Sequence, residues 1–189
     1  TDEDRINVYA PYGKKASYGT SFAAPWITRK MAFLIYKMGL TKEVAKALLI
    51  DSAAGWKKNT YNSEVIGYGV VPKKIDSIIQ CENDEIRFVI SEVSELFDTY
   101  NYNIPVPVYQ ESQPFIAKAT LCYFPKCSRN QGVDYTDTEL DLHFGRIKDN
   151  GIKPIDNNIQ NDEGKYFLKE GRARQLYRKW DNIKLIGEE

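Results

Sequence analysis

The fold of this chain is restricted first by a long apolar segment that follows directly on a small polar patch. Residues 17–26 read SYGTSFAAPW, and from Phe22 to Met38 apolar side chains occur on nearly every face of an expected helix. A helix that is apolar all round is typical of a protein core. Because Pro25 is tolerated only near the start of a helix, we expect the helix to begin near Ser21 and to end at Gly39.

Short elements surround this helix. Residues 6–11, INVYAP, are predicted to form a strand that leads into a loop broken by Gly13 and Gly19. Thr41 is placed to cap a second helix, TKEVAKALLIDSA, that ends by Gly55 and turns an inward stripe toward the core: Val44, Ala47 and Leu48.

A glycine-punctuated segment and a third helix complete the first part of the chain. GYGVV is predicted to be a short strand or extended turn. PKKIDSIIQ follows, and Pro72 should lie close to the first position of a short helix.

The pattern changes after Cys81–Glu85 from helical spacing to alternation. Strand-like segments are EIRFVIS at 85–91, FIAKATLCYF at 115–124, TELDLHFGRI at 138–147 and two or three runs within 164–186. Helices first and strands later favour two domains. We expect residues 1–82 to be a mainly helical α/β unit and residues 83–189 to be an all-β sandwich or jelly roll whose end is cut short.

The charge balance and the length of the apolar runs argue against several classes of protein. Basic and acidic side chains number 26 each, which gives no overall electrostatic reason for a nucleic-acid or membrane partner. No apolar run reaches the roughly 18 residues that a membrane span needs. The start of the chain has no Met and no signal peptide, so we expect a segment of a longer protein. The odd number of cysteines favours an intracellular setting.

The three cysteines are an odd number, which argues against a secreted disulfide framework. Cys122 and Cys127 flank YFPK and could meet across a turn, but we expect reduced structural thiols. The spacing does not fit a zinc site, and no metal ligands are assigned.

Ser21 is the residue in this chain best placed for chemistry. A serine at the start of a buried helix lies at the positive end of the helix dipole, beside N–H groups that have no partner within the helix. Those donors can stabilise an oxyanion, with the N–H of Ser21 itself among them. Gly19 permits a tight turn and a close approach of substrate backbone, with Thr20 as its neighbour. The same position also suits an ordinary N-cap.

The string Gly19-Thr20-Ser21-Phe22-Ala23-Ala24-Pro25 resembles the nucleophile motif G-T-S-x-A-x-P of the subtilisin-like serine proteases. The preceding INVYAP, the helix from Phe22, the helix TKEVAKALLIDSA and the closing GYGVV follow in the family's order over about Ile6 to Ile79. The resemblance implies a C-terminal portion of a doubly wound catalytic domain and a serine endopeptidase with Ser21 as nucleophile. Many members carry His where this chain has Trp26, a position outside the catalytic triad.

The order Asp, His, Ser of the family implies that the other triad residues and the oxyanion Asn precede Ser21. The single histidine, His143, lies beside Asp141 in the β part and is interpreted as a solvated strand residue. We therefore expect these 189 residues alone to hydrolyse peptides poorly or not at all, with the upstream part of the same protein supplying Asp and His. No cofactor is evident, although the resemblance allows calcium.

A second hypothesis is a non-catalytic pseudoprotease or interaction module whose β-sandwich binds a partner protein. A basic run with interleaved aromatics at 165–180 is interpreted as a polar strand or helix face, not a nucleic-acid surface. Without the cover of further strands, we expect exposed apolar surface or a dimer in the helical part.

Overall fold

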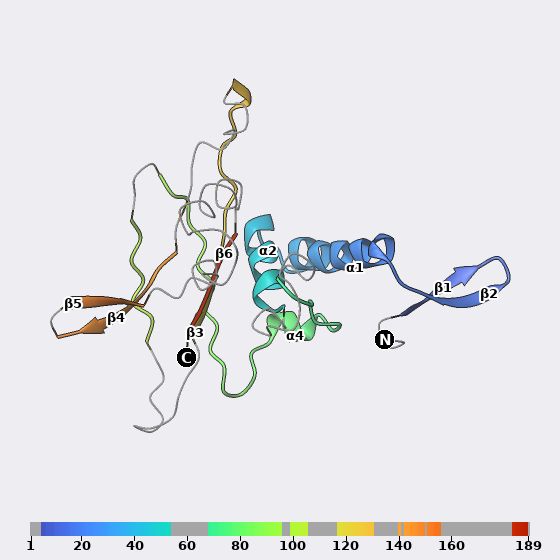
Figure 1. Cartoon of the computed structure of the whole chain (residues 1–189), viewed down its shortest axis with the longest axis horizontal. Coiled ribbons are helices and arrows are strands. Elements are labelled where there is room, and N and C mark those ends of the chain that lie inside the picture. Colours follow the sequence, from blue (N-terminus) through green and yellow to red (C-terminus); the bar gives the residue numbers. More distant parts are fainter. Residues whose placement is uncertain are drawn as a thin grey trace, which may run out of the picture.

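A computed structural model describes residues 5–53, 68–95, 99–105, 117–130, 140, 142–149, 151–155 and 183–188. Figure 1 shows a hairpin at one end of the molecule, helices in the middle and further strands beyond them. The elements are β1 (Ile6–Ala10), β2 (Gly13–Ser17), α1 (Thr20–Ala32), η2 (Phe33–Lys37), α2 (Lys42–Asp51), α4 (Asp76–Ile79), β3 (Ala117–Cys122), β4 (Phe144–Lys148), β5 (Gly151–Ile155) and β6 (Ile183–Glu188).

The predicted first strand is confirmed and is one arm of a hairpin. β1 pairs antiparallel with β2, with Ile6 opposite Ser17 and Ala10 opposite Gly13. Gly13 has a φ of 119°, a conformation that suits glycine in the tight connection between the strands. None of the ten strand residues is buried, so the hairpin lacks a hydrophobic core of its own.

Helix α1 begins at Thr20, with Gly19 as its N-cap residue, close to the start predicted from Pro25. The prediction of a helix buried on all sides is wrong. Within α1 only Lys30 is buried, whereas Trp26 is 41% exposed. The reason is that few described segments pack on the helix: α2 and the residues near Ile75 cover one side only. The expected exposed apolar surface is therefore present.

The helical segment ends in a wider turn. Residues Phe33–Lys37 form a π-helix, in which Met38 donates its N–H to the carbonyl of Phe33 at 3.2 Å. Gly39 then adopts a φ of 71°, and its N–H bonds to the carbonyl of Ile35 at 3.1 Å. The prediction that Gly39 terminates this segment is confirmed, because a left-handed residue closes the helix end.

Helix α2 begins as predicted, with Thr41 as the N-cap whose Oγ1 accepts from the N–H of Val44 at 3.3 Å. The predicted inward stripe is partly wrong. Val44 is buried, but Ala47 and Leu48 are only half-buried. The stripe is rotated by one residue because the core forms against a cluster that α2 shares with η2 and α4: Leu34, Ala45, Leu49 and Ile78.

The segment before α4 differs from its prediction in position. The short helix exists, but it begins at Asp76, so Pro72 lies four residues ahead of its first residue. Residues 73–75 form a bend instead of the first helical turn. In the predicted strand GYGVV, Val70 makes a single bridge; residues 54–67, including Gly55, lie outside the described residues.

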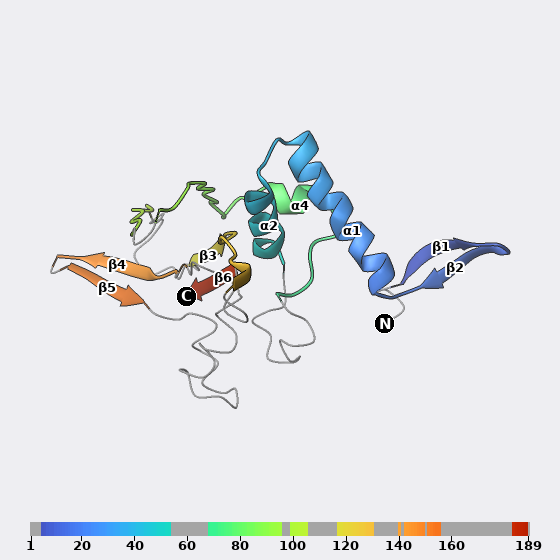
Figure 2. The ribbon, with the colours of Figure 1, turned by 90° about the horizontal axis from the view of Figure 1, so that it is seen from above.

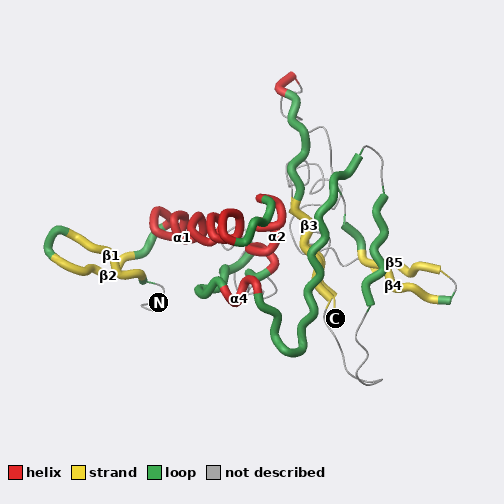
Figure 3. The backbone as a smooth tube through the Cα atoms, turned by 180° about the vertical axis from the view of Figure 1, so that it is seen from behind, coloured by secondary structure: helices red, strands yellow, loops and turns green. Residues whose placement is uncertain are grey.

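The described residues form three separate two-stranded antiparallel sheets: β1–β2 in the first part of the chain, and β3–β6 and β4–β5 in the β part. Strand β3 matches the prediction at 115–124, and β4 covers the end of the prediction at 138–147. The prediction of a strand at 85–91 is wrong, because these residues pair with no other strand and are drawn as loop in Figure 3.

Within the described ranges there is neither a parallel sheet nor two sheets packed face to face. The doubly wound domain, the β-sandwich and the boundary at 82/83 therefore stay predictions. The basic run at 165–180 lies outside the described residues.

Candidate active site at the start of helix α1

Ser21 is the second residue of α1 and is exposed to solvent. The carbonyl of Gly19 accepts hydrogen bonds from the N–H groups of Phe22 at 3.0 Å and Ala23 at 3.1 Å. The helix therefore starts its ladder at Phe22. The N–H groups of Thr20 and Ser21 come too early in the helix to bond a carbonyl within it, as is usual in a first turn.

The interpretation of Ser21 as both cap and nucleophile is corrected in one respect. Gly19 occupies the N-cap position, and no side chain donates or accepts a cap hydrogen bond at this helix. The Ser21 hydroxyl is thus not used to cap α1. It lies among first-turn N–H groups at the positive end of the helix dipole, where a developing negative charge is favoured.

Gly19 has a φ of 147° and a ψ of 159°, a backbone conformation that L-residues with a side chain rarely adopt. A Cβ atom at this position would meet only the Phe22 ring, at 3.9 Å, which is ordinary contact. Backbone conformation, not space, therefore requires glycine here. This conformation turns the chain from β2 into α1 within two residues and leaves Ser21 at the corner.

Pro25 lies inside α1 and has no N–H to donate to the carbonyl of Ser21, four residues earlier. A proline in the second turn thus frees one acceptor beside the hydroxyl of Ser21. The first turn of α1 therefore offers N–H donors and the Ser21 hydroxyl, and the Ser21 carbonyl lacks the hydrogen bond that residue 25 donates in a regular helix.

His143 does not lie near this corner. It directly precedes β4, and Figures 1 and 2 both show β4 and the start of α1 on opposite sides of α2. His143 is exposed, in agreement with its interpretation as a solvated residue. The described residues bring no imidazole to Ser21.

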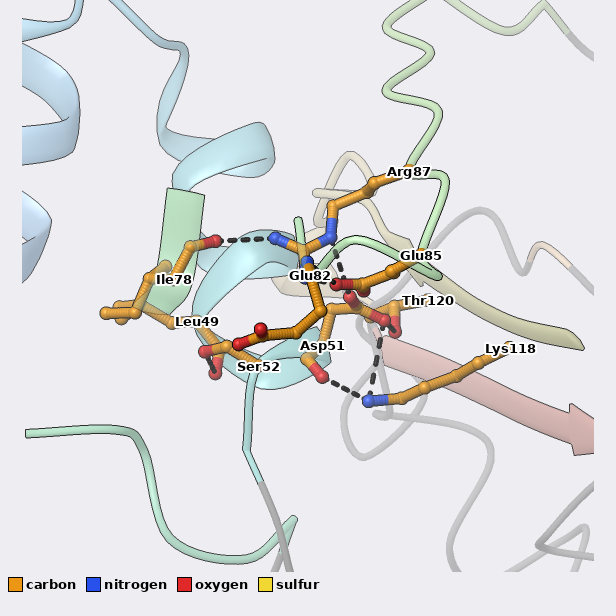
Figure 4. A network of polar contacts seen from close by, with 9 residues as sticks. All are labelled: Leu49, Asp51, Ser52, Ile78, Glu82, Glu85, Arg87, Lys118 and Thr120. Atoms are coloured by element: carbon orange, nitrogen blue, oxygen red, sulfur yellow. Dashed lines mark hydrogen bonds and ion pairs between the residues drawn. The ribbon is translucent and has the colours of Figure 1, made fainter. Parts of the chain in front are cut away.

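A cluster of charged side chains joins the helices to β3 (Figure 4). Lys118 donates to the carbonyl of Asp51, and Thr120 Oγ1 donates to Asp51 Oδ1 at 3.0 Å. Arg87 donates through Nη1 to the carbonyl of Ile78 at 2.7 Å and through Nη2 to Glu85 Oε1 at 2.8 Å.

Two carboxylates and two cations balance in this cluster. Arg87 Nε is buried without a hydrogen-bond acceptor in the described chain, and Asp51 Oδ2 compensates its charge from 3.6 Å. Burial lowers the pKa of Lys118, and Asp51 opposes that effect. The set is balanced in charge, although Arg87 Nε lacks a hydrogen-bond acceptor, and it serves as a structural contact between α2 and β3.

Sequence reasoning missed Lys30, which is only 5% exposed. Its Nζ donates to the carbonyls of Pro72 at 2.8 Å and Lys73 at 2.6 Å, and lies 4.7 Å from the centre of the Trp26 ring. Burial, and then the neighbouring charge of Arg29, lower the pKa of Lys30. No local signal sets this lysine apart in the sequence, because Thr28 and Arg29 directly precede it and are exposed.

Comparisons with protein-family models, with curated proteins and with solved structures gave no match to this chain. No helix in the described ranges is long and apolar enough to cross a membrane. Cys81, Cys122 and Cys127 form no disulfide, so the two cysteines that flank YFPK are not bridged. Among the residues that the structure describes, no three metal-binding side chains come together.

Proposed function

We propose that Ser21 is the nucleophile of a subtilisin-like serine endopeptidase, and that the substrate is a peptide or protein. The observation that carries this proposal is the exposed hydroxyl of Ser21 in the first turn of α1, directly after a strand hairpin and a glycine of unusual φ. Attack on a peptide carbonyl generates an oxyanion, which first-turn N–H groups are suited to bind.

The proton of the Ser21 hydroxyl needs a base within hydrogen-bond distance. Because β4, which His143 directly precedes, and the start of α1 lie on opposite sides of α2, we assign the base and its carboxylate partner to polypeptide outside these 189 residues. In the subtilisin-like order, both groups precede the serine. The 189-residue chain alone therefore supplies the nucleophile and an oxyanion donor without general-base catalysis.

The test is covalent labelling by a fluorophosphonate, read out by mass spectrometry of the labelled peptide. In a full-length protein that carries this segment, the label should be on Ser21 and should disappear in Ser21→Ala. Ser17→Ala is the matched control, because Ser17 ends β2 only four residues earlier and should leave labelling intact. A full-length protein that is never labelled at Ser21 would refute the proposal.

The remoteness of His143 also favours a second candidate function, a non-catalytic module that binds a partner protein. The two candidates differ in the full-length protein: the module predicts no serine-directed label and no peptide turnover. An assay of the isolated 189-residue chain tests separately whether the base lies outside it. Peptide turnover by the 189 residues alone, lost in Ser21→Ala, would show that the base lies within this chain.

A further inference from the structure

The neutral total charge of the chain hides a strong local asymmetry. From residue 5 to residue 41 there is no acidic side chain, and the basic ones are Arg5, Lys14, Lys15, Arg29, Lys30 and Lys37. The described part of residues 82–105 has the opposite character. Its one basic residue, Arg87, is already paired, and the acidic ones are Glu82, Asp84, Glu85, Glu92 and Glu95.

The basic part ends in a hairpin that is incomplete as a β-structure. β1 and β2 form a two-stranded sheet, so in the described chain each has one edge without a neighbouring strand. No residue of the hairpin is buried, and an isolated hairpin of this kind is marginally stable in water. A further strand added at an open edge would supply both main-chain hydrogen bonds and apolar cover.

The acidic part is an extended segment with no ladder. Residues 85–95 pair with no strand, although the side chains of Phe88 and Ile90 follow strand-like alternation and are exposed. Arg87 ties the start of the segment to Ile78 and Asp51. Further along, Tyr100 donates to the carbonyl of Val93 at 3.3 Å, and Tyr102 donates to Glu92 Oε2 at 2.8 Å.

These two complementary surfaces cannot meet within one molecule as it is folded. Figures 1 and 2 both place the hairpin beyond α1 and the segment 82–95 on the far side of α2. We propose that the chain associates head to tail with a second copy, in which the hairpin β1–β2 of one molecule binds the acidic segment 82–95 of the next. This association does not depend on the chemistry of Ser21.

The charges fit an added strand on both of its faces. Lys14 and Lys15 are neighbours in β2, so their side chains point to opposite faces of the hairpin. Glu92 and Glu95 are three residues apart, so in an added strand their side chains would point to opposite faces. Each face of the joined ladder would then carry one lysine and one carboxylate, and opposite charges on neighbouring strands attract each other.

A polypeptide partner fits better than a nucleic acid, although exposed tyrosines accompany the lysines of the hairpin. An open strand edge offers N–H and C=O groups that only another polypeptide can pair in a ladder. Because the surface used on one copy differs from that used on the other, the contact is heterologous and can propagate into short chains of molecules.

The experiment is sedimentation velocity of the 189-residue protein over a range of concentrations. We expect reversible association that weakens about tenfold between low salt and about 0.5 M salt. Lys14→Glu/Lys15→Glu should weaken it about tenfold or more. The matched control is Lys73→Glu/Lys74→Glu, which makes the same charge change at two exposed lysines outside the hairpin and should leave association unchanged.

The decisive arm is charge exchange between two variants. Lys14→Glu/Lys15→Glu mixed with Glu92→Lys/Glu95→Lys should restore association that each variant lacks alone. A neutral variant, Lys14→Gln/Lys15→Gln, gives an independent measure if charge reversal disturbs the hairpin.

Four results would overturn the proposal. The protein could be monomeric at every concentration. It could self-associate equally well in the hairpin variants, which would place the contact on the apolar face of α1. The mixture of the two charge-reversed variants could fail to associate. The protein could also bind single-stranded nucleic acid in preference to a second copy of itself.

Discussion

Lys118 in β3 donates a hydrogen bond to the backbone carbonyl of Asp51, the last residue of α2, and its Nζ lies 3.5 Å from Oδ1 of the same residue. One lysine thus holds both the main chain and the carboxylate at the end of a helix. Phe124 extends the contact toward the other end of α2, where Lys42 and Lys46 lie 4.9 and 5.3 Å from its ring centre. Strand β3 and the residues after it therefore follow the length of α2.

Asp51→Asn should lower the free energy of unfolding by about 1–3 kcal/mol. The substitution keeps the size of the side chain but leaves the cations of Lys118 and Arg87 without their shared carboxylate. Urea denaturation followed by circular dichroism measures the loss. Asp149→Asn, in the exposed turn between β4 and β5, is the control and should change stability by less than about 0.5 kcal/mol. Equal effects of the two variants would contradict a specific role for Asp51.

Phe124→Leu should lower stability by about 1 kcal/mol, because leucine keeps apolar area but has no aromatic ring for the two ammonium groups. Phe88→Leu is a matched control, since the two rings are almost equally exposed, at 48% and 49%. The midpoint of chemical denaturation should fall for Phe124→Leu and stay nearly constant for Phe88→Leu. A similar shift in both would mean that ring size, and not the cation contact, decides.

Gly39→Ala should cost about 1–2 kcal/mol, because a φ of 71° places the alanine Cβ against its own backbone. A Cβ atom at this position would meet nothing else within 4 Å, so the cost is conformational and not a clash with a neighbour. Gly39→Asn should be less damaging, because asparagine tolerates the left-handed region better. Thermal unfolding of the two variants tests this order, and equal melting temperatures would speak against it.

Lys30 should make stability rise with pH on the alkaline side. Burial lowers its pKa in the folded protein below the ordinary value of 10.5, so the unfolded chain binds the proton more tightly. The unfolding free energy should therefore increase as pH rises from the folded pKa toward 10.5. Lys30→Met removes this slope. Denaturation midpoints at neutral and alkaline pH should diverge between the two proteins, and parallel pH profiles would refute the assignment.

Local sequence patterns were sufficient to predict the helix boundaries at Thr41 and Gly39 and the strand around 117–122. A cap hydroxyl, a glycine of positive φ and side-chain alternation act over a few residues, so they can be read without a partner. The same kind of evidence singled out Ser21 and Gly19, whose chemical role stays a prediction. The start of α1 at Thr20 followed from Pro25 for the same local reason.

Tertiary structure alone decided which residues are buried and which distant groups meet. The apolar segment from Phe22 gave no sign that Lys30 would be its most enclosed polar residue, nor that one side of the helix would face solvent. The contact of Asp51 with Lys118 joins residues 67 apart in sequence. Residues 85–91 alternate like a strand yet pair with none. Burial and ladder pairing depend on what packs alongside, which no local pattern contains.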